Sequence, residues 1–315
     1  MNLFESMRYL SALHQHGHFG RAAQACHITQ PGLSNAIRAM EEELGVTIVR
    51  RGRQYEGLTA EGQLVLECAN RMLNEQEVLR QELTLAQRHP RGDLSIGAVP
   101  TAVPIASRFA ARLRARHNGI TVTVRTLSSR EIETGIDDFG LDVAFGYVER
   151  ASPPTGSRLK VFKQYDERYY VLRQVPGGGR GQRRIGKPIR WRDAAALPLC
   201  MLSPEMHNRT VVDLAFQRAG AQVKSAIDTS AVLALMVTVQ TGEVCSIAPG
   251  SLVTVATQLP GIQACPLIEP EIVVGIGLLT LMNARASLAH KAAIALARDE
   301  TWLREAARYG DLRAQ

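Results

Sequence analysis

The sequence predicts an α/β protein with an N-terminal winged helix-turn-helix, a long linker helix, and two doubly wound α/β lobes. Three observations support this: two short amphipathic helices followed by an arginine-rich hairpin, a stretch after residue 62 without glycine or proline until Pro90, and alternating strands and helices from Leu94 onward. We therefore expect boundaries at 1–58, 59–89 and 90–315. The last part divides into lobe I (about 90–163 and 268–307) and lobe II (about 164–267).

The helix pair near the N-terminus is the most informative segment. An amphipathic helix from Leu3 is expected to end near Gly17, and a short second helix follows Phe19. A third helix should begin after Thr29, a good N-cap, and end at Gly45. Its apolar residues are spaced by four, three and four, which places them on one buried face. They are Leu33, Ile37, Met40 and Leu44.

A second face of this third helix, roughly a third of a turn from the apolar stripe, is polar and carries an arginine. Its side chains are short or forked, and such groups donate to phosphates and base edges in the DNA major groove. Residues 47–59 read as a hairpin whose turn carries further arginines, suited to a phosphate backbone or narrow groove. The expected DNA contacts are Gln30, Pro31, Ser34, Asn35, Arg38, Arg50, Arg51 and Arg53. The alternative is an ordinary amphipathic helix and turn with solvated charges.

Residues 1–65 resemble the winged helix-turn-helix of LysR-type transcriptional regulators. The matching positions are Phe19, Ala22-Ala23, Gln30-Pro31-Gly32-Leu33-Ser34, Met40-Glu41, Leu44-Gly45, Arg51-Gly52-Arg53 and Leu58-Thr59-Ala60-Glu61-Gly62. The sequence departs from the pattern at His18, Gly32 and Ile48-Val49. The resemblance implies a bacterial, cytoplasmic, homotetrameric regulator with a periplasmic-binding-protein-like sensor. It also implies two partners, promoter DNA and a small-molecule effector.

Bulk charge does not explain DNA binding. The chain has a formal net charge of +7, yet residues 1–91 hold ten arginines and ten acidic residues. Affinity for DNA must therefore depend on where Arg38 and the hairpin arginines point.

The five cysteines are scattered and include no CxxC pair, which favours reduced thiols in a cytoplasmic protein. A redox switch, known in one branch of the family that the chain resembles, is the alternative. A signal peptide and an apolar run of about 18 residues are both missing from the sequence, so we expect neither secretion nor a membrane span.

The linker helix carries a seven-residue apolar repeat. Val65, Met72, Leu79 and Ala86 recur at this interval, and Ala69, Gln76 and Leu83 follow the first three by four residues. A repeat of this kind lets two helices pack along a shared seam. We therefore expect a homodimer that binds a palindromic or pseudo-palindromic DNA site.

In the C-terminal part, the alternation of strands and helices predicts parallel sheets with right-handed crossovers. We expect the chain to pass between the lobes near 163–168 and 267–271. Two such lobes place a ligand cleft at the carboxyl ends of their strands. The expected wall comprises Pro100, Thr101, Ala102, Leu127, Ser128, Phe145, Gly146, Met201, Leu202, Ser203, Asn208, Arg209, Thr229, Ser230, Ala248 and Pro249.

The polar groups of this wall favour an organic anion, such as a small carboxylate. Thr101, Ser203 and Ser230 lie near expected helix N-termini, where hydroxyls and free N–H groups attract negative charge, although each could instead be a helix cap. Arg209 falls one turn into a helix, where a cation opposes the dipole. Either a ligand carboxylate or a neighbour such as Glu205 or Asp213 would explain it.

Other function classes find little support in the residues. Gly181–Lys187 has phosphate-loop spacing, but Pro188 occupies the position of the magnesium-binding hydroxyl. His14, His16 and His18 have no cysteine or carboxylate placed to complete a metal shell. We find no nucleophile elbow, HExxH motif or catalytic carboxylate pair, and so expect no enzyme, metal or cofactor. Two rivals remain: a small-molecule-binding transport component, which leaves residues 1–91 unexplained, and an α/β enzyme.

Overall fold

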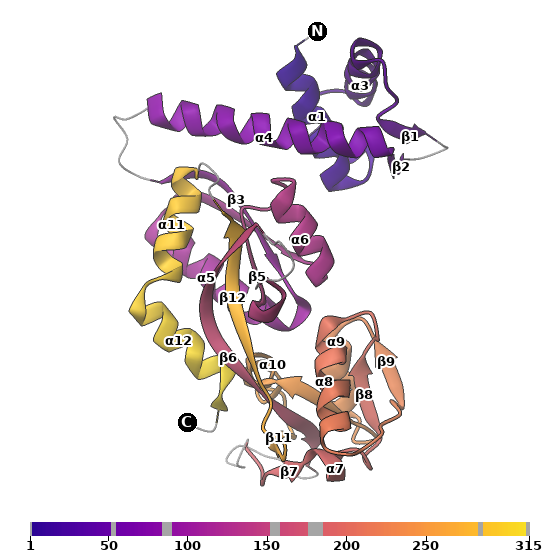
Figure 1. Ribbon diagram of the computed structural model, residues 1–315, viewed down its shortest axis with the longest axis vertical. Coiled ribbons are helices and arrows are strands. Elements are labelled where there is room, and N and C mark those ends of the chain that lie inside the picture. The colour runs from indigo at the N-terminus through magenta and orange to yellow at the C-terminus, as the bar shows by residue number, and fades with distance from the viewer. Residues whose placement is uncertain are drawn as a thin grey trace. The chain divides into compact units, whose positions relative to one another are not determined.

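The computed structural model describes residues 2–51, 55–83, 90–151, 158–175, 185–282 and 286–312. The chain forms two compact units (Figure 1). The first comprises residues 1–89 with the short segments 134–141 and 283–288, and the second comprises residues 90–133, 142–282 and 289–315. Among the described helices, none is long and apolar enough to cross a membrane.

The first unit contains the expected helix-turn-helix and hairpin. Its elements are α1 (Leu3–His16), α2 (Phe19–Ala25), α3 (Gln30–Leu44), β1 (Val49–Arg51), β2 (Tyr55–Leu58) and α4 (Ala60–Leu83). Gly17 and Gly45, with φ of 59° and 66°, end α1 and α3 in the left-handed conformation that glycine adopts without strain. Thr29 Oγ1 accepts a hydrogen bond from the Gly32 N–H and caps α3.

The apolar stripe of α3 forms the core of this unit. Leu33, Ile37 and Met40 are fully buried and pack in one cluster with Leu10 and Leu13 of α1. The expectation for Leu44 was wrong, because its side chain is 44% exposed. Leu44 is the last residue of α3, where the chain turns away from the core at Gly45.

Two residues of the family motif hold the hairpin against the helices. Glu41 Oε1 accepts hydrogen bonds from the N–H groups of Ile48 and Val49, at 2.8 and 3.0 Å. Thr59 Oγ1 donates to the Thr47 carbonyl at 2.6 Å and accepts from the Gly62 N–H at 2.8 Å, so one hydroxyl joins the hairpin to the start of α4. A Cβ on Gly62 would lie 2.1 Å from the Ile48 carbonyl oxygen.

We therefore expect Gly62→Ala to destabilise the first unit by about 1–3 kcal/mol, because the hairpin and α4 must move apart to admit one methyl group. Chemical denaturation monitored by circular dichroism would measure the loss. Gly57→Ala in β2 is the control, since its Cβ position is open and only the positive φ of 105° carries a cost. Equal stability of Gly62→Ala and the wild type would contradict this role.

The apolar repeat of α4 divides into two parts with different roles. Val65 and Ala69 pack into the core of their own unit, so the first turns of the expected seam are occupied. Met72 and Leu79 are 42% and 52% exposed, and Leu64 is 66% exposed. A partner helix could therefore pack only on the later part of the predicted seam. Ala86 lies outside the described residues, as does the side chain of Leu83.

The second unit consists of two sheets that share one long strand, β6 (Leu159–Gln174). One sheet has the order β4-β3-β5-β12-β6, and β6 continues into the other as β6-β10-β8-β9, with β11 on its free edge. The first sheet contains β3 (Arg91–Ala98), β4 (Gly119–Thr126), β5 (Val143–Tyr147) and β12 (Val273–Leu281). The second contains β7 (Ile189–Arg190), β8 (Leu199–Leu202), β9 (Ile227–Thr229), β10 (Cys245–Pro249) and β11 (Ile262–Ile268).

Helices cover these sheets and connect their strands. Those associated with the first sheet are α5 (Val103–Arg116), α6 (Ser129–Asp137), α11 (Leu288–Ala297) and α12 (Glu300–Gly310), with short 3-10 turns η1 (Pro100–Ala102) and η2 (Val148–Ala151). Those of the second are α7 (Trp191–Ala194), α8 (His207–Arg218), α9 (Val232–Gln240) and α10 (Gly250–Ala256).

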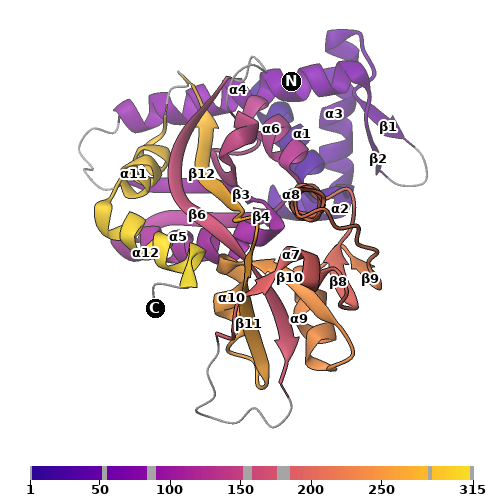
Figure 2. The ribbon, with the colours of Figure 1, turned by 60° about the horizontal axis from the view of Figure 1, so that its bottom comes forward.

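The structure of this unit differs in three details from what the sequence suggests. The sheets are mixed rather than parallel, because β12 runs antiparallel to β5, and β6 runs antiparallel to β12, β10 and β11. The chain does pass between the sheets near 163–168, but it does so within one continuous strand, β6, rather than through a connection between two separate strands. Figure 2 shows β6 and β12 running from one sheet toward the other. Neither α10 nor β11 had a separate signal in the sequence. The C-terminal stretch forms two helices, α11 and α12, because the Asp299 carboxylate caps the start of α12.

Candidate nucleic-acid interface and small-molecule pocket

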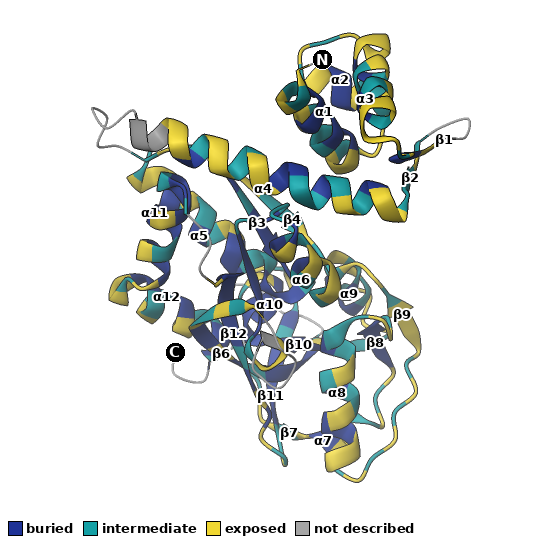
Figure 3. Cartoon of the chain, turned by 45° about the horizontal axis from the view of Figure 1, so that its top comes forward, coloured by how far each residue is buried: buried dark blue, intermediate teal, exposed yellow. Residues whose placement is uncertain are grey.

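The polar face of α3 lies at the surface of the first unit. Gln30, Pro31, Asn35 and Arg38 are exposed and Ser34 is half-buried, whereas the apolar stripe faces the core (Figure 3). Arg38 forms no ion pair with any carboxylate of the described chain. Its guanidinium is therefore available to an external anion.

Of the hairpin arginines, only Arg50 has a described side chain. Arg50 lies on β1 and is exposed. Arg51 belongs to the same strand, but its side chain lies outside the described residues, as does the whole of Arg53.

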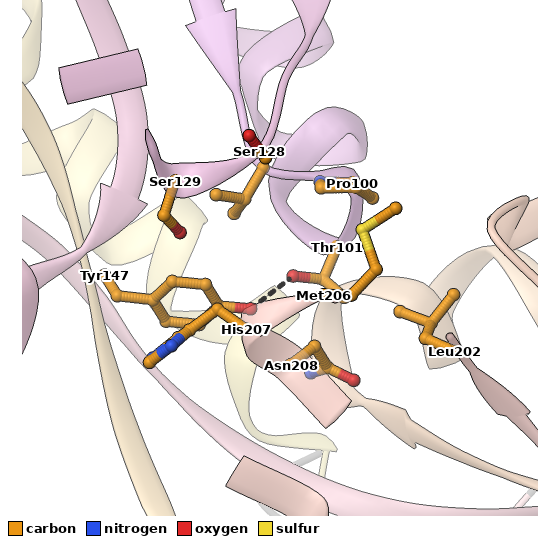
Figure 4. Close-up of a pocket in the computed structure, with 10 residues that line it drawn as sticks. Pro100, Thr101, Ser128, Ser129, Tyr147, Leu202, Met206, His207 and Asn208 are labelled. Atoms are coloured by element: carbon orange, nitrogen blue, oxygen red, sulfur yellow. Dashed lines mark hydrogen bonds between the residues drawn. The ribbon is translucent and has the colours of Figure 1, made fainter. Parts of the chain in front are cut away.

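A pocket in the second unit is built from the starts of three helices. Val99–Thr101 leads into α5, Ser128 and Ser129 begin α6, and Met206–Asn208 begins α8. Tyr147 from the end of β5 and Leu202 from the end of β8 complete the lining (Figure 4). Because these segments follow strand ends, the pocket lies where a ligand is expected in an α/β fold.

Hydroxyl and amide groups line the base of the pocket. Thr101 Oγ1 and the Tyr147 hydroxyl are 3.2 Å apart and joined by a hydrogen bond (Figure 4). Asn208 Nδ2 donates to the Tyr169 hydroxyl at 3.0 Å. The His207 ring lies against Tyr147, with ring centres 4.5 Å apart, and its Nε2 is 3.0 Å from Glu149 Oε1.

The helix starts place main-chain dipoles beside the pocket. Neither α5 nor α8 has a side chain capping its first turn. The 3-10 turn η1 leads directly into α5, Pro104 of α5 has no N–H, and the Arg209 N–H of α8 donates to the Met206 carbonyl, so only the earliest N–H groups at these helix starts can face a ligand. At α6, Ser128 and Glu131 cap each other reciprocally. Burial raises the pKa of Tyr147 far above its usual value, so its hydroxyl stays protonated and can donate. The pocket thus offers donors and partial positive charge, and its lining includes neither lysine nor arginine.

The enclosed space of the pocket is small. It is close to the volume that a single water molecule requires. A larger ligand would therefore have to widen the pocket by moving Met206, Leu202 or the helix starts.

The structure brings together only part of the expected wall. Pro100, Thr101, Ser128, Leu202 and Asn208 line the pocket, but the other predicted residues do not. Most of these are held elsewhere by packing: Ala102, Phe145, Met201 and Ala248 are buried core residues, and Pro249 pairs with Tyr169 in the sheet. Thr229 Oγ1 caps the Ala231 N–H, Ser203 N–H donates to the Thr229 carbonyl, and Ser230 is exposed. Leu127 and Gly146 are also absent from the lining.

Arg209 is explained by its neighbours. Its Nε lies 2.9 Å from Asp213 Oδ1, and its Nη1 donates to Asp228 Oδ1 at 2.6 Å and to the Leu202 carbonyl at 2.9 Å. The side chain is only 11% exposed. Of the two explanations left open by the sequence, the structure supports a carboxylate neighbour, and Arg209 is not part of the pocket lining.

Five lining residues were not anticipated: Val99, Ser129, Tyr147, Met206 and His207. Tyr147 closes a buried strand and Ser129 follows Ser128, so both had a local signal in the sequence. Val99, Met206 and His207 had no such signal. They lie at helix starts, where the main chain can contact a ligand whatever the side chain is, so their residue types do not mark them as pocket residues.

The described cysteines and possible metal ligands form no site at this pocket. All five cysteines are free thiols, and none of them lines the pocket. Burial raises the pKa of Cys200, Cys245 and Cys265, so these thiols are less nucleophilic than exposed ones. In the part of the chain that the structure describes, no group of three or more His, Cys, Asp or Glu side chains could hold a metal ion.

Comparison with known families settles the identity of both units. Residues 4–63 match the model of the bacterial regulatory helix-turn-helix protein, lysR family, and residues 87–302 match the LysR substrate binding domain. The chain belongs to the LysR family. The two models follow one another along most of the chain and describe a regulator rather than an enzyme.

Curated relatives of this LysR-family chain match over part of their length. The SDS degradation transcriptional activation protein of Pseudomonas sp. (strain ATCC 19151) is 36% identical over 149 residues, covering 45% of this chain and 49% of the relative. The dual regulator OxyR of Escherichia coli (strain K12) is 39% identical over 104 residues, 33% of this chain and 34% of OxyR. The matches thus span about half and about a third of these relatives.

Solved structures of the family share the fold over nearly the whole chain. A full-length OxyR variant from Pseudomonas aeruginosa aligns with a TM-score of 0.68 at 21% identity, covering 98% of this chain and 95% of that one. Full-length CbnR in complex with its target DNA aligns with a TM-score of 0.63 at 21% identity, covering 96% and 99%.

Proposed function

We propose that this LysR-family protein is a sequence-specific transcriptional regulator whose DNA binding responds to a small anionic effector. The observation that carries the DNA-binding part is the division of α3 into a buried apolar stripe and an exposed face with Gln30, Asn35 and Arg38. An exposed recognition helix followed by a hairpin fits the major groove, with Arg50 beside the phosphate backbone. CbnR, a protein of similar fold, has been solved in complex with its target DNA. Such a function is expected in the bacterial cytoplasm.

The test of DNA binding is a gel-shift assay with the segment just upstream of the gene. We expect a shift that competitor DNA of unrelated sequence does not abolish and that weakens as salt rises, because counterions are released on binding. A shift that unrelated DNA removes equally well would contradict sequence-specific regulation.

For the effector, the pocket chemistry favours a small carboxylate. The starts of α5 and α8, which no side chain caps, and the hydroxyls of Thr101 and Tyr147 can provide donors for an anion without a formal cation. A neutral polar molecule is the second candidate, since the pocket has room for little more than a water. An OxyR variant from Corynebacterium glutamicum, of similar fold, has been solved with hydrogen peroxide bound.

A thermal-shift screen with sodium formate, sodium acetate and hydrogen peroxide separates these candidates. A ligand that binds only the folded protein increases the free energy of unfolding, by about 2.7 kcal/mol when its concentration is 100 times its Kd. The midpoint temperature of unfolding rises as a result. Stabilisation by formate or acetate but not by sodium chloride supports an anion site. Stabilisation by peroxide alone supports the neutral candidate.

We expect Thr101→Val to remove most of the stabilisation that the bound anion gives the wild type. The change keeps the shape of the buried side chain but removes the hydroxyl that contacts Tyr147, and it costs about 1 kcal/mol in the free protein. Thr280→Val is a matched control, because it removes another buried hydroxyl, bonded to His290 and the Asp142 carbonyl, outside the pocket. An unchanged anion response in Thr101→Val would remove Thr101 from the site.

We also propose that two copies associate through α4 and that dimers assemble further into a tetramer. The exposed Met72 and Leu79 support the dimer, since a partner helix would remove this apolar surface from water. Two recognition helices would then read a pseudo-palindromic DNA site.

A further inference from the structure

A buried carboxyl group lies on the strand that joins the two sheets, close to the pocket. Along β6, Arg168 pairs with Val273 of β12, and Tyr169 pairs with Pro249 of β10, so the strand changes partners between these residues. Glu167 immediately precedes this point and is fully buried. Because side chains alternate along a strand, Glu167 shares its face with Tyr165 and Tyr169 and not with Arg168.

If Glu167 is ionised, the hydrogen-bonded groups around it have too few protons for the contacts that the structure shows. Ser251 Oγ lies 2.9 Å from the main-chain oxygen of Thr101 and forms a short hydrogen bond with Glu167 Oε1. The Tyr165 hydroxyl also donates to Oε1, at 3.2 Å. A serine hydroxyl has a single proton, so Ser251 cannot donate both to the Thr101 carbonyl and to Glu167. Glu167 Oε2 has no hydrogen-bond partner among the described residues.

A proton on Glu167 resolves this count. Glu167 then donates to Ser251 Oγ, Ser251 donates to the Thr101 carbonyl, and Tyr165 donates to Glu167. An ionised Glu167 would instead bury a full negative charge with Oε2 lacking any hydrogen-bond donor among the described residues, which is strongly unfavourable.

No basic side chain of the described chain compensates such a charge. Arg168, on the other face of β6, pairs with Glu271 and Asp311. The residue opposite Glu167 on β12 is Val274. Glu149 Oε1 and His207 Nε2 are 3.0 Å apart, and the His207 ring lies against Tyr147 at the pocket.

The titratable groups that face Glu167 are three tyrosines: Tyr165 and Tyr169 on its own strand and Tyr147 on β5. Burial raises the pKa of all three, so they remain neutral donors. Burial also raises the pKa of Glu167 to about 7, although hydroxyl groups that donate to the carboxylate act in the opposite direction.

We propose that Glu167 holds its proton while an anion occupies the pocket, and that loss of this proton lowers the affinity of the pocket for anions. The inference rests on the proposed anionic effector. Its physical basis is twofold: an ionised Glu167 would repel the anion, and it would break the hydrogen-bonded chain through Ser251 that supports Thr101. Glu167 is thus a positioning residue that makes the effector response depend on pH.

The protonation state can be tested without any ligand. The native pKa of about 7 exceeds the ordinary 4.5, so the stabilisation is complete below about pH 4.5 and is lost as pH rises through about 7. Relative to Glu167→Gln, which is neutral at every pH, the unfolding constant of the wild type should rise by up to about tenfold per pH unit across this window. If the free energy of unfolding measured in urea changes with pH in the same way for the wild type and for Glu167→Gln, the proposal is overturned.

Asp142→Asn is the matched control, since Asp142 is a second buried acid whose pKa burial raises, to about 6. This variant should keep the pH dependence that Glu167→Gln loses. If Glu167→Gln does not fold, difference infrared spectra of the wild type decide the matter. The proposal predicts a protonated-carboxyl stretch that is lost as the pH rises through about 7 and that the Asp142→Asn variant shows as well. Absence of this stretch contradicts the proposal.

The link to the pocket is tested with sodium formate as the probe. We expect the formate-induced thermal shift of the wild type to shrink at least about threefold between pH 6 and pH 8, as Glu167 loses its proton. The shift of Glu167→Gln should stay constant over this range. A wild-type shift that does not change with pH would overturn the coupling. If formate gives no shift at any pH, the anionic effector fails while the denaturation comparison still decides the proton on Glu167.

Discussion

Replacing Arg38 by alanine should weaken binding to the upstream DNA by about 1–3 kcal/mol for each protomer bound, roughly 5- to 150-fold. Arg38 is exposed at the centre of the polar face of α3 and forms no ion pair with the described residues. DNA binding therefore does not have to break an ion pair of the Arg38 guanidinium before this group contacts a phosphate or a guanine edge.

Two readouts separate a base contact from a phosphate contact at Arg38. If Arg38 contacts a phosphate, the dependence of log K on log salt should become shallower by about one for each protomer, and all sequences should lose affinity alike. If it contacts a base edge, discrimination between the specific site and unrelated DNA should fall. Fluorescence anisotropy with labelled duplexes at several salt concentrations measures both quantities.

Arg8→Ala is the matched control for Arg38→Ala. Arg8 is also an exposed arginine of the first unit, but it lies on α1 and pairs with Glu5 at 2.6 Å. Both variants should keep the stability of the wild type within about 0.5 kcal/mol, since each removes a surface side chain. Equal affinity of Arg38→Ala and the wild type would refute the assignment of α3 as the recognition helix.

The double variant Met72→Glu, Leu79→Glu should convert the protein to a species that does not dimerise through α4. Met72 and Leu79 lie two turns apart on one exposed side of the helix, and glutamates there would bring like charges together across a two-fold seam. Because a dimer binds its second half-site as a linked event, affinity for the full DNA site should fall by about 10²-fold or more. Analytical ultracentrifugation and anisotropy would measure the two effects.

Arg71→Glu is a suitable control for this variant. It lies on the same helix, is exposed, and changes the net charge by the same amount, but it is about 100° away from Met72 around the helix. A double variant that remains dimeric, with DNA affinity like that of Arg71→Glu, would show that the seam lies elsewhere.

Much of the first unit was predictable because its signals are local. Thr29 and Gly45 mark the ends of α3 through hydrogen bonds and backbone angles that involve residues only a few positions away. The spacing of Leu33, Ile37 and Met40 defines the buried face by helix geometry alone. Leu44 and the first turns of the α4 seam were misjudged, because their surroundings depend on where the neighbouring elements pass.

The pocket was only partly predictable, since its residues converge from distant parts of the chain. Strand-to-helix turns indicated Thr101, Ser128 and Asn208, and the structure brings all three to one place. Which other predicted residues join them depends on packing. Phe145, for example, faces Phe109 in the core rather than the pocket, with ring centres 5.3 Å apart.

The amino-acid sequence by itself determined the bounds of α3, its buried and polar faces and the resemblance to the family, because periodicity, caps and turns act over a few residues. Only the tertiary structure decided the partners of charged and polar groups that lie far apart in the chain. In the folded protein Arg209 donates a hydrogen bond to Asp228, nineteen residues away, and Glu167 forms a hydrogen bond with Ser251, eighty-four residues away. The physical reason is that the charge and proton of a buried group are set by whatever the fold places within hydrogen-bond distance.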